Sequence, residues 1–417
     1  MRFEFSVLRD FRSLREARPE WAPGLNLILG PNGSGKTNLL ESLNILAGWG
    51  TFQGRTSGAV SWDSEKGRAL LGARVNGEEE HELQVQISGR MTPRLDGKHA
   101  TFTDLRLAVP SITFLPADIN LVEGSPAVRR LFLDRLCALC SVPYARRLAE
   151  FRQISRHRTA LLRQGRPVHG TTLPFARLGG WIMETRRRAV SLLMTLPQSG
   201  VPSGPHSGVP AGPQSGPSGL KLRGPAERVS QRPTEWASQR PAERVSQREP
   251  PPLKSPAAHE VGFPAAHTAG SLPAHTVGSL PAFSFTMTPE LEGSGAESLL
   301  RGLEETAEKE RYALRPLVGP NRDDLVLISM GRPAAESLSR GQKRRLVLSL
   351  ILRAGRLIEL QLRRKPVLFF DDLAAELDAD ARHESGAALL ATGWQIFVTG
   401  TEDPFGGLDS STLCLPL

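Results

Sequence analysis

The 417-residue sequence predicts an α/β fold with a phosphate-binding loop after one buried strand and two aspartates after another. Three observations support this prediction. Residues 30–37 read GPNGSGKT and lie between an apolar run, 25–29, and a helical segment. A second apolar run, 367–370, ends in two acidic residues. Near residue 125 the apolar pattern changes from strand to helix, which predicts an antiparallel β subdomain followed by an inserted helical arm.

The glycine-rich loop has the residue types that hold a phosphate chain. Its glycines let successive backbone N–H groups face one anion, and the following helix adds the positive end of its dipole. In such loops the lysine reaches the β- and γ-phosphates and the hydroxyl after it ligates magnesium. A flexible Gly/Ser loop is the alternative, but the flanking strand and helix favour a nucleotide site. The residues expected to bind nucleotide are Gly30, Pro31, Asn32, Gly33, Ser34, Gly35, Lys36 and Thr37.

The acidic residues near the C-terminus predict a metal ligand and a base. The apolar run 367–370 reads as a buried strand that delivers a carboxylate to a site. Asp371 fits the magnesium-holding position, so Thr37 and Asp371 are the expected metal ligands. Asp372 follows, where a general base faces an attacking water. A simple turn after the strand is the alternative interpretation of the two aspartates.

A second anion site is predicted at the start of a later helix. Ser339, Gly341 and Gln342 precede the apolar run 346–352. A serine and a glycine at the mouth of a helix leave backbone N–H groups available to an anion. In isolation Ser339 is better interpreted as an ordinary helix N-cap. Its occurrence together with the two other motifs, in this order, favours the anion site.

The N-terminal third is expected to be rich in strands. Phe3, Phe5 and Val7 alternate in a first strand, and the connection to residues 25–29 contains Arg12, which is either a phosphate contact or a solvated side chain. Residues 38–48 form the helix after the loop. Three further strands, joined by the turn signals Asn76-Gly77 and Asp96-Gly97, are expected to cover one side of the sheet: 69–75, 83–87 and 111–115.

Helical periodicity begins at Ser125-Pro126. Three apolar stripes follow, at 148–162 with an interruption near His157, at 178–192 and at 299–314, which suggests helices that run out and back. Most of their arginines are interpreted as exposed helix faces, and a subset as contacts to DNA phosphates. These arginines are Arg146, Arg147, Arg152, Arg156, Arg158, Arg163, Arg186, Arg187 and Arg188.

Residues 197–281 differ in composition from the rest. They contain 16 of the 33 prolines, and the segment from Pro225 to Arg232 recurs from Pro241 to Arg248. Such a segment buries too little apolar surface to offset its ordering entropy. We expect a disordered, repeat-expanded insert at the tip of the arm.

Composition excludes several classes of protein. No apolar run approaches 18 residues, so no transmembrane helix is expected, and the N-terminus does not read as a signal peptide. Three cysteines indicate a reducing, cytoplasmic environment. Cys137 and Cys140 are expected to be buried structural residues, because no second pair completes a zinc site. The net charge of +9 favours a polyanionic partner.

Seven segments together resemble the RecF family of bacterial DNA replication and repair ATPases. The similarity covers most of residues 1–195 and 285–405. The segments are, in order, DFRS, GLNLILGPNGSGKTNLLESL, SITFLPADINLVEGSPAVRRLFLDRL, GPNRDDL, SRGQKRRLVLSL, PVLFFDDLAAELD and QIFVTGT. The family belongs to the ABC/SMC-like P-loop ATPases, which have an ATPase head and an inserted helical arm. The resemblance therefore implies head segments at 1–124 and 317–417 and an arm at 125–316.

The resemblance also assigns roles. It implies that residues 30–37 are Walker A, Asp371-Asp372 Walker B, Ser339-Arg340-Gly341-Gln342 the signature and Glu376-Leu377-Asp378 the D-loop. In such ATPases ATP lies between Walker A of one subunit and the signature of another. The implied protein is a slow, DNA-stimulated ATPase switch that uses ATP and Mg²⁺ and forms a homodimer on gapped or junction DNA. It would help RecR and RecO to load RecA.

The sequence departs from the family pattern at several positions. Asn321 replaces a usual histidine, and Gln53 replaces a basic residue for which Arg55 is a substitute. No histidine occupies the ABC switch position near Thr399, and no Q-loop residue is assigned.

Three alternatives remain open. They are a transporter ATPase, another SMC-type repair or chromosome ATPase, and a DNA clamp that binds ATP without appreciable turnover. A transporter ATPase has a shorter helical insertion, and an SMC protein has arms with sustained heptads.

Overall fold

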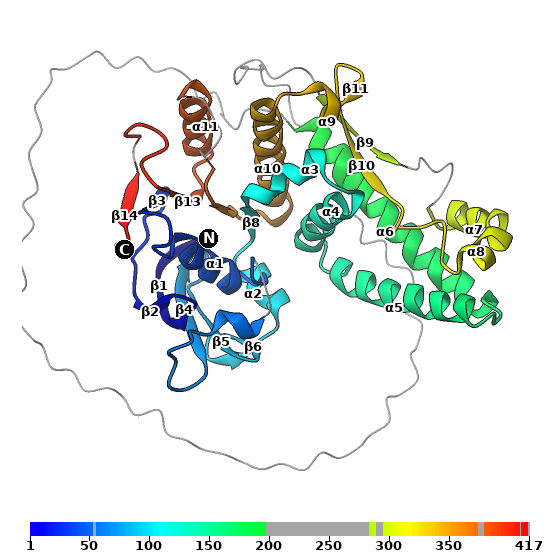
Figure 1. Cartoon of the computed structure of the whole chain (residues 1–417), viewed down its shortest axis with the longest axis horizontal. Coiled ribbons are helices and arrows are strands. Elements are labelled where there is room, and N and C mark those ends of the chain that lie inside the picture. Colours follow the sequence, from blue (N-terminus) through cyan, green and yellow to red (C-terminus); the bar gives the residue numbers. More distant parts are fainter. Residues whose placement is uncertain (53–55, 197–282, 289–294, 374–378, 409, 416–417) are drawn as a thin grey trace, which may run out of the picture. The chain divides into compact units, whose positions relative to one another are not determined.

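The computed structural model describes residues 1–52, 56–196, 283–288, 295–373, 379–408 and 410–415 (Figure 1). The predicted insert at 197–281 and the predicted D-loop at 376–378 lie outside the described residues, as do Gln53 and Arg55.

A five-stranded parallel sheet carries the nucleotide motifs. Its strand order is β14-β3-β13-β12-β8, and every neighbouring pair is parallel. Because the carboxyl ends of parallel strands lie at one edge, the sheet brings the glycine-rich loop and the aspartate pair together. The strands are β3 (Leu25–Leu29), β8 (Ser111–Phe114), β12 (Val367–Phe370), β13 (Gln395–Gly400) and β14 (Ser411–Cys414).

Both faces of this sheet are covered. Val367 and Phe369 pack into one apolar cluster with α1 (Lys36–Leu46), while Leu368 and Phe370 pack into another with α10 (Arg340–Leu362). This alternation explains why β12 is fully buried and reads as a continuous apolar run. The sequence prediction of a buried strand before Asp371 is therefore confirmed. The helix α11 (Ala379–Ala391) lies between β12 and β13 in the chain.

A six-stranded antiparallel sheet of order β2-β1-β4-β5-β6-β7 forms the predicted β subdomain. Both turn signals connect neighbouring strands, and Asp96 and Gly97 have the positive φ angles, 51° and 73°, that two-residue hairpin turns require. The strands are β1 (Arg2–Phe11), β2 (Leu14–Ala17), β4 (Ala69–Asn76), β5 (His81–Ser88), β6 (Arg90–Leu95) and β7 (Lys98–His99).

Two details of the strand prediction are wrong. The segment 111–115 does not join the antiparallel sheet, because β8 pairs in parallel with β12. In β1 the register shifts between Phe3 and Phe5, so Phe3 and Leu8 are buried while Phe5 is only half-buried. A bulge of this kind reverses the inward phase of the strand beyond it. Periodicity alone does not report such a shift.

Several short helices that the sequence pattern did not predict lie in the connections between strands. The helix α2 (Phe102–Ala108) is fixed by a capping box in which Thr101 accepts from the Asp104 N–H. The others are η1 (Thr56–Ala59), η2 (Pro116–Ile119), α3 (Asn120–Glu123) and α9 (Ala334–Ser337).

The helical arm is built around α6, which packs against α5 and α7 (Figure 1). A Cβ atom on Gly180 would lie 2.3 Å from the Ala296 nitrogen, so this close approach of α6 and α7 requires glycine. The helices that contain the second and third predicted stripes thus pack against each other. The arm helices are α4 (Pro126–Cys140), α5 (Tyr144–Arg163), α6 (His169–Thr195), α7 (Gly295–Glu305) and α8 (Ala307–Ala313).

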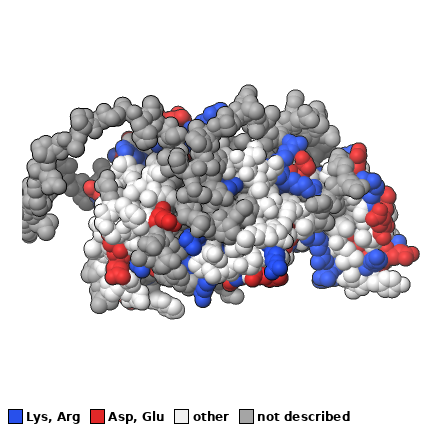
Figure 2. Space-filling view, turned by 90° about the horizontal axis from the view of Figure 1, so that it is seen from above, with Lys and Arg blue, Asp and Glu red and all other residues white. Residues whose placement is uncertain are grey.

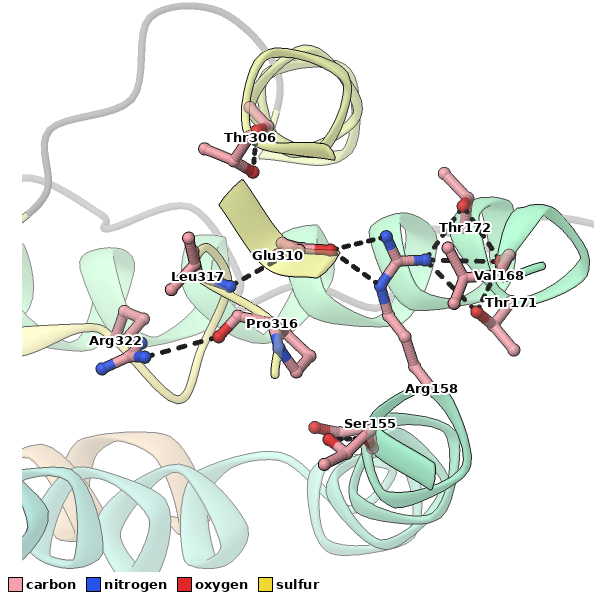
Figure 3. A network of polar contacts seen from close by, with 12 residues as sticks. Ser155, Arg158, Val168, Thr171, Thr172, Thr306, Glu310, Pro316, Leu317 and Arg322 are labelled. Atoms are coloured by element: carbon pink, nitrogen blue, oxygen red, sulfur yellow. Dashed lines mark hydrogen bonds and ion pairs between the residues drawn. The ribbon is translucent and has the colours of Figure 1, made fainter. Parts of the chain in front are cut away.

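The interruption near His157 is a buried ion pair, not a break in α5. Arg158 is 2% exposed and donates to the Glu310 carboxylate at 2.8 Å and to the hydroxyls of Thr171 and Thr172 (Figure 3). Glu310 also accepts from the Leu317 N–H. Arg158 is therefore not an exposed arginine. The third stripe is wrong at its end, because Leu314 is exposed and Glu310 is buried.

A second buried network involves Arg186, which is 2% exposed. Its guanidinium donates to Asp134 at 2.8 Å and to Asp323 at 2.9 Å, and Tyr144 donates to Asp134 at 2.6 Å. The network joins α4, α5 and α6 to the turn before β10 (Asp324–Ser329). The assignment of Arg186 to an exposed helix face is therefore wrong.

A three-stranded antiparallel sheet, β11-β10-β9, was not predicted. It consists of β9 (Phe283–Thr288), β10 (Asp324–Ser329) and β11 (Arg332–Pro333). Because β9 lies within the range expected for the arm and pairs with β10 beyond it, the boundary at residue 316 cuts through a sheet. None of the described helices is both long enough and apolar enough to cross a membrane.

Candidate nucleotide-binding site

The glycine-rich loop leaves β3 at Leu29 and enters α1 at Lys36. Gly33 and Gly35 have φ angles of 90° and 93°, in the region that favours glycine. Gly35 is the N-cap of α1, and a Cβ atom there would also lie 3.0 Å from the Leu14 side chain. The predicted glycines are thus required by the backbone path of the loop.

Lys36 extends back over this loop. Its ammonium group donates to the carbonyl oxygens of Gly30 and Pro31, each at 2.7 Å. The positive charge is therefore held beside the backbone turn and the N-terminus of α1, where an anion is favoured.

Thr37 and Asp371 meet although 334 positions separate them. The Thr37 hydroxyl lies 2.9 Å and 3.2 Å from the two carboxylate oxygens of Asp371. Protein-bound Mg²⁺ takes one or two such oxygens together with phosphate oxygens and water. The described residues contain no cluster of three or more His, Cys, Asp or Glu that would hold a metal alone. Thr37 and Asp371 therefore fit magnesium that arrives with a nucleotide.

These groups face a cavity of about 300 Å³ at the carboxyl edge of the parallel sheet. Its lining combines one lysine, two aspartates and many small or hydroxyl side chains, which suits a phosphate chain with a metal ion. The lining residues are Asn32, Gly33, Gly35, Lys36, Thr37, Asn38, Pro116, Asp371, Asp372, Thr399, Gly400 and Thr401.

Asp372 lies on the cavity wall in an unusual backbone conformation. Its φ of 51° is in the left-handed region, and its N–H donates to the Thr399 hydroxyl at 3.0 Å. The same hydroxyl donates to Asp371 at 2.7 Å. Sequence reasoning missed Thr399, although a polar residue at the end of an apolar strand was an available signal.

Arg12 is held by a carboxylate. Its guanidinium binds both oxygens of Glu41 in α1, at 2.6 Å and 2.8 Å, and this hydrogen bond raises the pKa of Arg12. Arg12 is not among the residues that line the cavity. Its assignment as a phosphate contact stays a prediction.

The predicted signature opens α10 with a capping box. Ser339 accepts from the Gln342 N–H at 3.3 Å, and the Gln342 side chain accepts from the Ser339 N–H at 2.9 Å. Neither these residues nor Gly341 line the cavity of the same chain. The N-cap interpretation of Ser339 is confirmed, and the second anion site stays a prediction.

Comparison with known proteins places the chain in a family. The family model described as "RecF/RecN/SMC N terminal domain" matches residues 5–406. The chain belongs to this family, and within it to the RecF proteins. The resemblance noted from the motifs is thereby confirmed, as is the predicted SMC-like head fold.

Two relatives named RecF are similar over nearly their whole length. "DNA replication and repair protein RecF" of Magnetococcus marinus is 28% identical over 98% of this chain and 94% of its own. The protein of the same name from Heliobacterium modesticaldum is 26% identical over 96% and 92%. The solved "Structure of the recombination mediator protein RecF-ATP in RecFOR pathway" is 19% identical, with a TM-score of 0.71 over 100% of this chain and 98% of that one. It has the same fold.

Proposed function

We propose that this RecF-family chain is an ATP-dependent DNA-binding protein of recombinational repair and replication maintenance. Membership of the RecF family supports the general role in DNA replication and repair. The observation that carries the ATP-dependent part is the meeting of Lys36, Thr37 and Asp371 in one cavity. This combination of an ammonium, a hydroxyl and a carboxylate is that of a Mg²⁺-nucleotide site.

Each side chain has a role in this proposal. The N–H groups of the loop and Lys36 bind the phosphates, while Thr37 and Asp371 hold Mg²⁺. When bound, Mg²⁺ neutralises charge that develops on the phosphate oxygens. Asp372, on the cavity wall, accepts a proton from the attacking water.

A nucleotide site formed by Walker A of one subunit and the signature of another requires a second copy of the chain. Ser339, Gly341 and Gln342 do not line the cavity of their own chain, so their contribution to nucleotide binding would come across a dimer interface. ATP would therefore drive dimerisation, and hydrolysis would release it. Such a cycle suits a slow switch.

The exposed arginines of α5 support DNA as the partner. Arg156 and Arg163 are exposed and lie on one helix face, seven positions apart. Basic and acidic side chains are interspersed over the uncovered part of the face in Figure 2, so net charge alone does not mark the DNA contact. Gapped or junction DNA, and help to RecR and RecO in loading RecA, follow from the RecF resemblance. A related structure's title places that protein in the RecFOR pathway.

Single-turnover ATP hydrolysis with and without gapped DNA tests the proposal. We expect slow hydrolysis that gapped DNA accelerates. Asp372→Asn should keep ATP affinity and lose hydrolysis, because it removes only the base. The matched control Asp63→Asn changes an exposed carboxylate paired with Arg15 outside the cavity and should behave as wild type. Hydrolysis that ignores DNA would favour a transporter-type ATPase, and an active Asp372→Asn variant would exclude this base.

An SMC-type protein is the second candidate. The arm helices α5 and α6 have 20 and 27 residues. At about 1.5 Å per residue, the longer one spans only roughly 40 Å, far short of an SMC coiled coil. The short arm favours the RecF role.

A further inference from the structure

We propose that Thr399 is a positioning residue that holds both aspartates of the nucleotide site in their working orientation. The inference rests on the proposed Mg²⁺-ATP function and adds a residue to which no motif assigned a role. Thr399 lies near the end of β13, between the strand that leads into the glycine-rich loop and the strand that leads into Asp371.

The position of Thr399 follows from the sheet register. Phe370 at the end of β12 pairs with Val398 of β13, so the next residues, Asp371 and Thr399, follow side by side, and Thr399 still pairs with Ile28 of β3. Thr399 is 2% exposed, and its hydroxyl donates to Asp371 Oδ1 at 2.7 Å. A buried hydroxyl held by a rigid parallel sheet orients a carboxylate more tightly than a loop residue would.

Asp371 thereby receives two hydroxyl contacts of different kinds. Thr37, on the side of the glycine-rich loop, is a candidate metal ligand, whereas Thr399 approaches from within the sheet. Oxygen ligands of metals are commonly oriented by such outer partners. Thr399 fixes the carboxylate so that Asp371 and Thr37 present their oxygens to one point.

The same hydroxyl controls Asp372. A threonine hydroxyl has one proton to donate and lone pairs that accept. The Thr399 hydroxyl donates a hydrogen bond to Asp371 and accepts one from the Asp372 N–H at 3.0 Å. This bond holds Asp372 at φ 51°, a conformation uncommon for non-glycine residues. One side chain thus sets the direction of the metal carboxylate and of the proposed base.

No histidine is among the described residues that line the cavity. The sequence has no switch histidine near Thr399, and a threonine hydroxyl lies at this strand end instead. The hydroxyl of Thr399 acts on the two aspartates of its own chain.

Valine and serine substitutions separate the hydroxyl from the shape of the side chain. Thr399→Val keeps the size and removes both hydrogen bonds, and Thr399→Ser keeps the hydroxyl. The control Thr185→Val changes a buried threonine of α6 that lies outside the cavity and whose hydroxyl donates to the Trp181 carbonyl. The binding readout is Mn²⁺ affinity in the presence of ADP, measured by electron paramagnetic resonance. The second readout is single-turnover ATP hydrolysis.

We expect Thr399→Val to weaken Mn²⁺ binding about ten- to a hundredfold, as outer-partner substitutions at metal sites do, and to slow hydrolysis by a similar factor. Nucleotide affinity without metal should stay at the wild-type value. Thr399→Ser and Thr185→Val should both remain within a few-fold of wild type. Urea unfolding confirms that the variants are folded, and Thr399→Ala replaces Thr399→Val if the latter is not.

The outcomes distinguish the inference from the proposed function. Wild-type protein that binds neither nucleotide nor Mn²⁺ would overturn the proposed function itself. Wild-type protein that binds both, with a folded Thr399→Val variant of unchanged Mn²⁺ affinity and hydrolysis, would overturn only the role of Thr399. A serine variant as defective as the valine variant would show that packing, not the hydroxyl, is what the site requires.

Discussion

Lys36 is the residue on which nucleotide affinity should depend most. Its ammonium already spans the carbonyls of Gly30 and Pro31, at the point where the loop and α1 favour an anion. Lys36→Ala removes a charged hydrogen-bond donor, and such bonds contribute about 1.5–3 kcal/mol. We therefore expect ATP affinity to fall by about one to two orders of magnitude in a fluorescence titration.

Lys98→Ala provides the control for that titration. Lys98 is an exposed lysine in β7 of the antiparallel sheet and does not line the cavity. The Lys98→Ala substitution should leave ATP affinity unchanged. Equal affinities for wild type and Lys36→Ala would contradict the assignment of the loop as Walker A.

At the residue scale, motifs predicted more of the site than periodicity did. The loop, Thr37 and Asp371 could be found because their types and flanking strands are fixed by phosphate and metal chemistry. The polar residue Thr399 at the end of an apolar strand was a visible signal, but its role depends on the register between β12 and β13, which the sequence does not report. Arg12 was identified as a functional candidate, but its bond to Glu41 depends on how β1 meets α1, which no local pattern reports.

At the element scale, the arm shows that the number of arginines on a helix does not tell which of them are exposed. Arg158 follows Leu148, Phe151 and Ser155 on the buried stripe of α5. Arg186 similarly lies among buried residues of α6. Helical spacing therefore held the information that these two side chains are inside. What the sequence alone lacked was the identity of the acidic partners, Glu310 and Asp323, more than a hundred positions away.

Arg186 and Arg188 should differ sharply in their effect on stability. Arg186→Gln removes the ion pair of buried Asp323 and one of the two ion pairs of Asp134, which keeps Arg152. Breaking a buried pair costs about 3–5 kcal/mol. Arg188→Gln breaks only an exposed i,i+4 pair with Glu184 and should change the free energy of unfolding by less than about 0.5 kcal/mol. Urea unfolding of both variants measures this contrast, and equal midpoints would refute the buried network.

DNA contact by the arm should depend on its exposed arginines instead. Each phosphate contact contributes about −0.9 to the slope of log affinity against log salt on duplex DNA. Replacing Arg156 and Arg163 together by Gln should flatten that slope by about 1.8 if both contact phosphates. Arg90→Gln, at an exposed arginine of β6 outside the arm, serves as the control. An unaltered slope in the double variant would mean that this face of α5 does not touch DNA.

At the scale of the whole molecule, the proposed dimer can be tested through Ser339. Ser339→Arg places bulk and charge where a second copy would bring its phosphate, so it should prevent dimers with a non-hydrolysable ATP analogue in light scattering. It also removes an N-cap, which costs about 1 kcal/mol. Ser339→Ala loses the same cap without the bulk and should still dimerise. If Ser339→Arg dimerises normally, ATP is not sandwiched at this residue.

The overall arrangement could be predicted only in part. The order of the motifs was enough to identify one ATPase head made from both ends of the chain. The pairing of β9 with β10 was beyond reach, because short strands far apart in sequence carry no signal of their partner.

The structure on either side of the insert makes a deletion practicable. The N–H of Phe285 in β9 lies 3.2 Å from the sulfur of Met194 near the end of α6, so the described chain ends that flank the insert are neighbours. A short linker can therefore join them. Because loop-closure entropy grows with the logarithm of length, shortening about 80 residues to about ten changes stability by on the order of 2 kcal/mol at most.

We predict that replacing residues 200–280 by a short Gly/Ser linker leaves ATP binding and DNA-stimulated hydrolysis within a few-fold of wild type. The proline content and internal repeats of the segment, together with its lack of an apolar stripe, give it little to bury against the arm. As a control, the same linker is inserted after residue 165, in the loop between α5 and α6, where we expect it to be tolerated. If the shortened protein were insoluble or inactive, or if the intact protein protected amides across this span from hydrogen exchange, the segment would be a structural part of the arm.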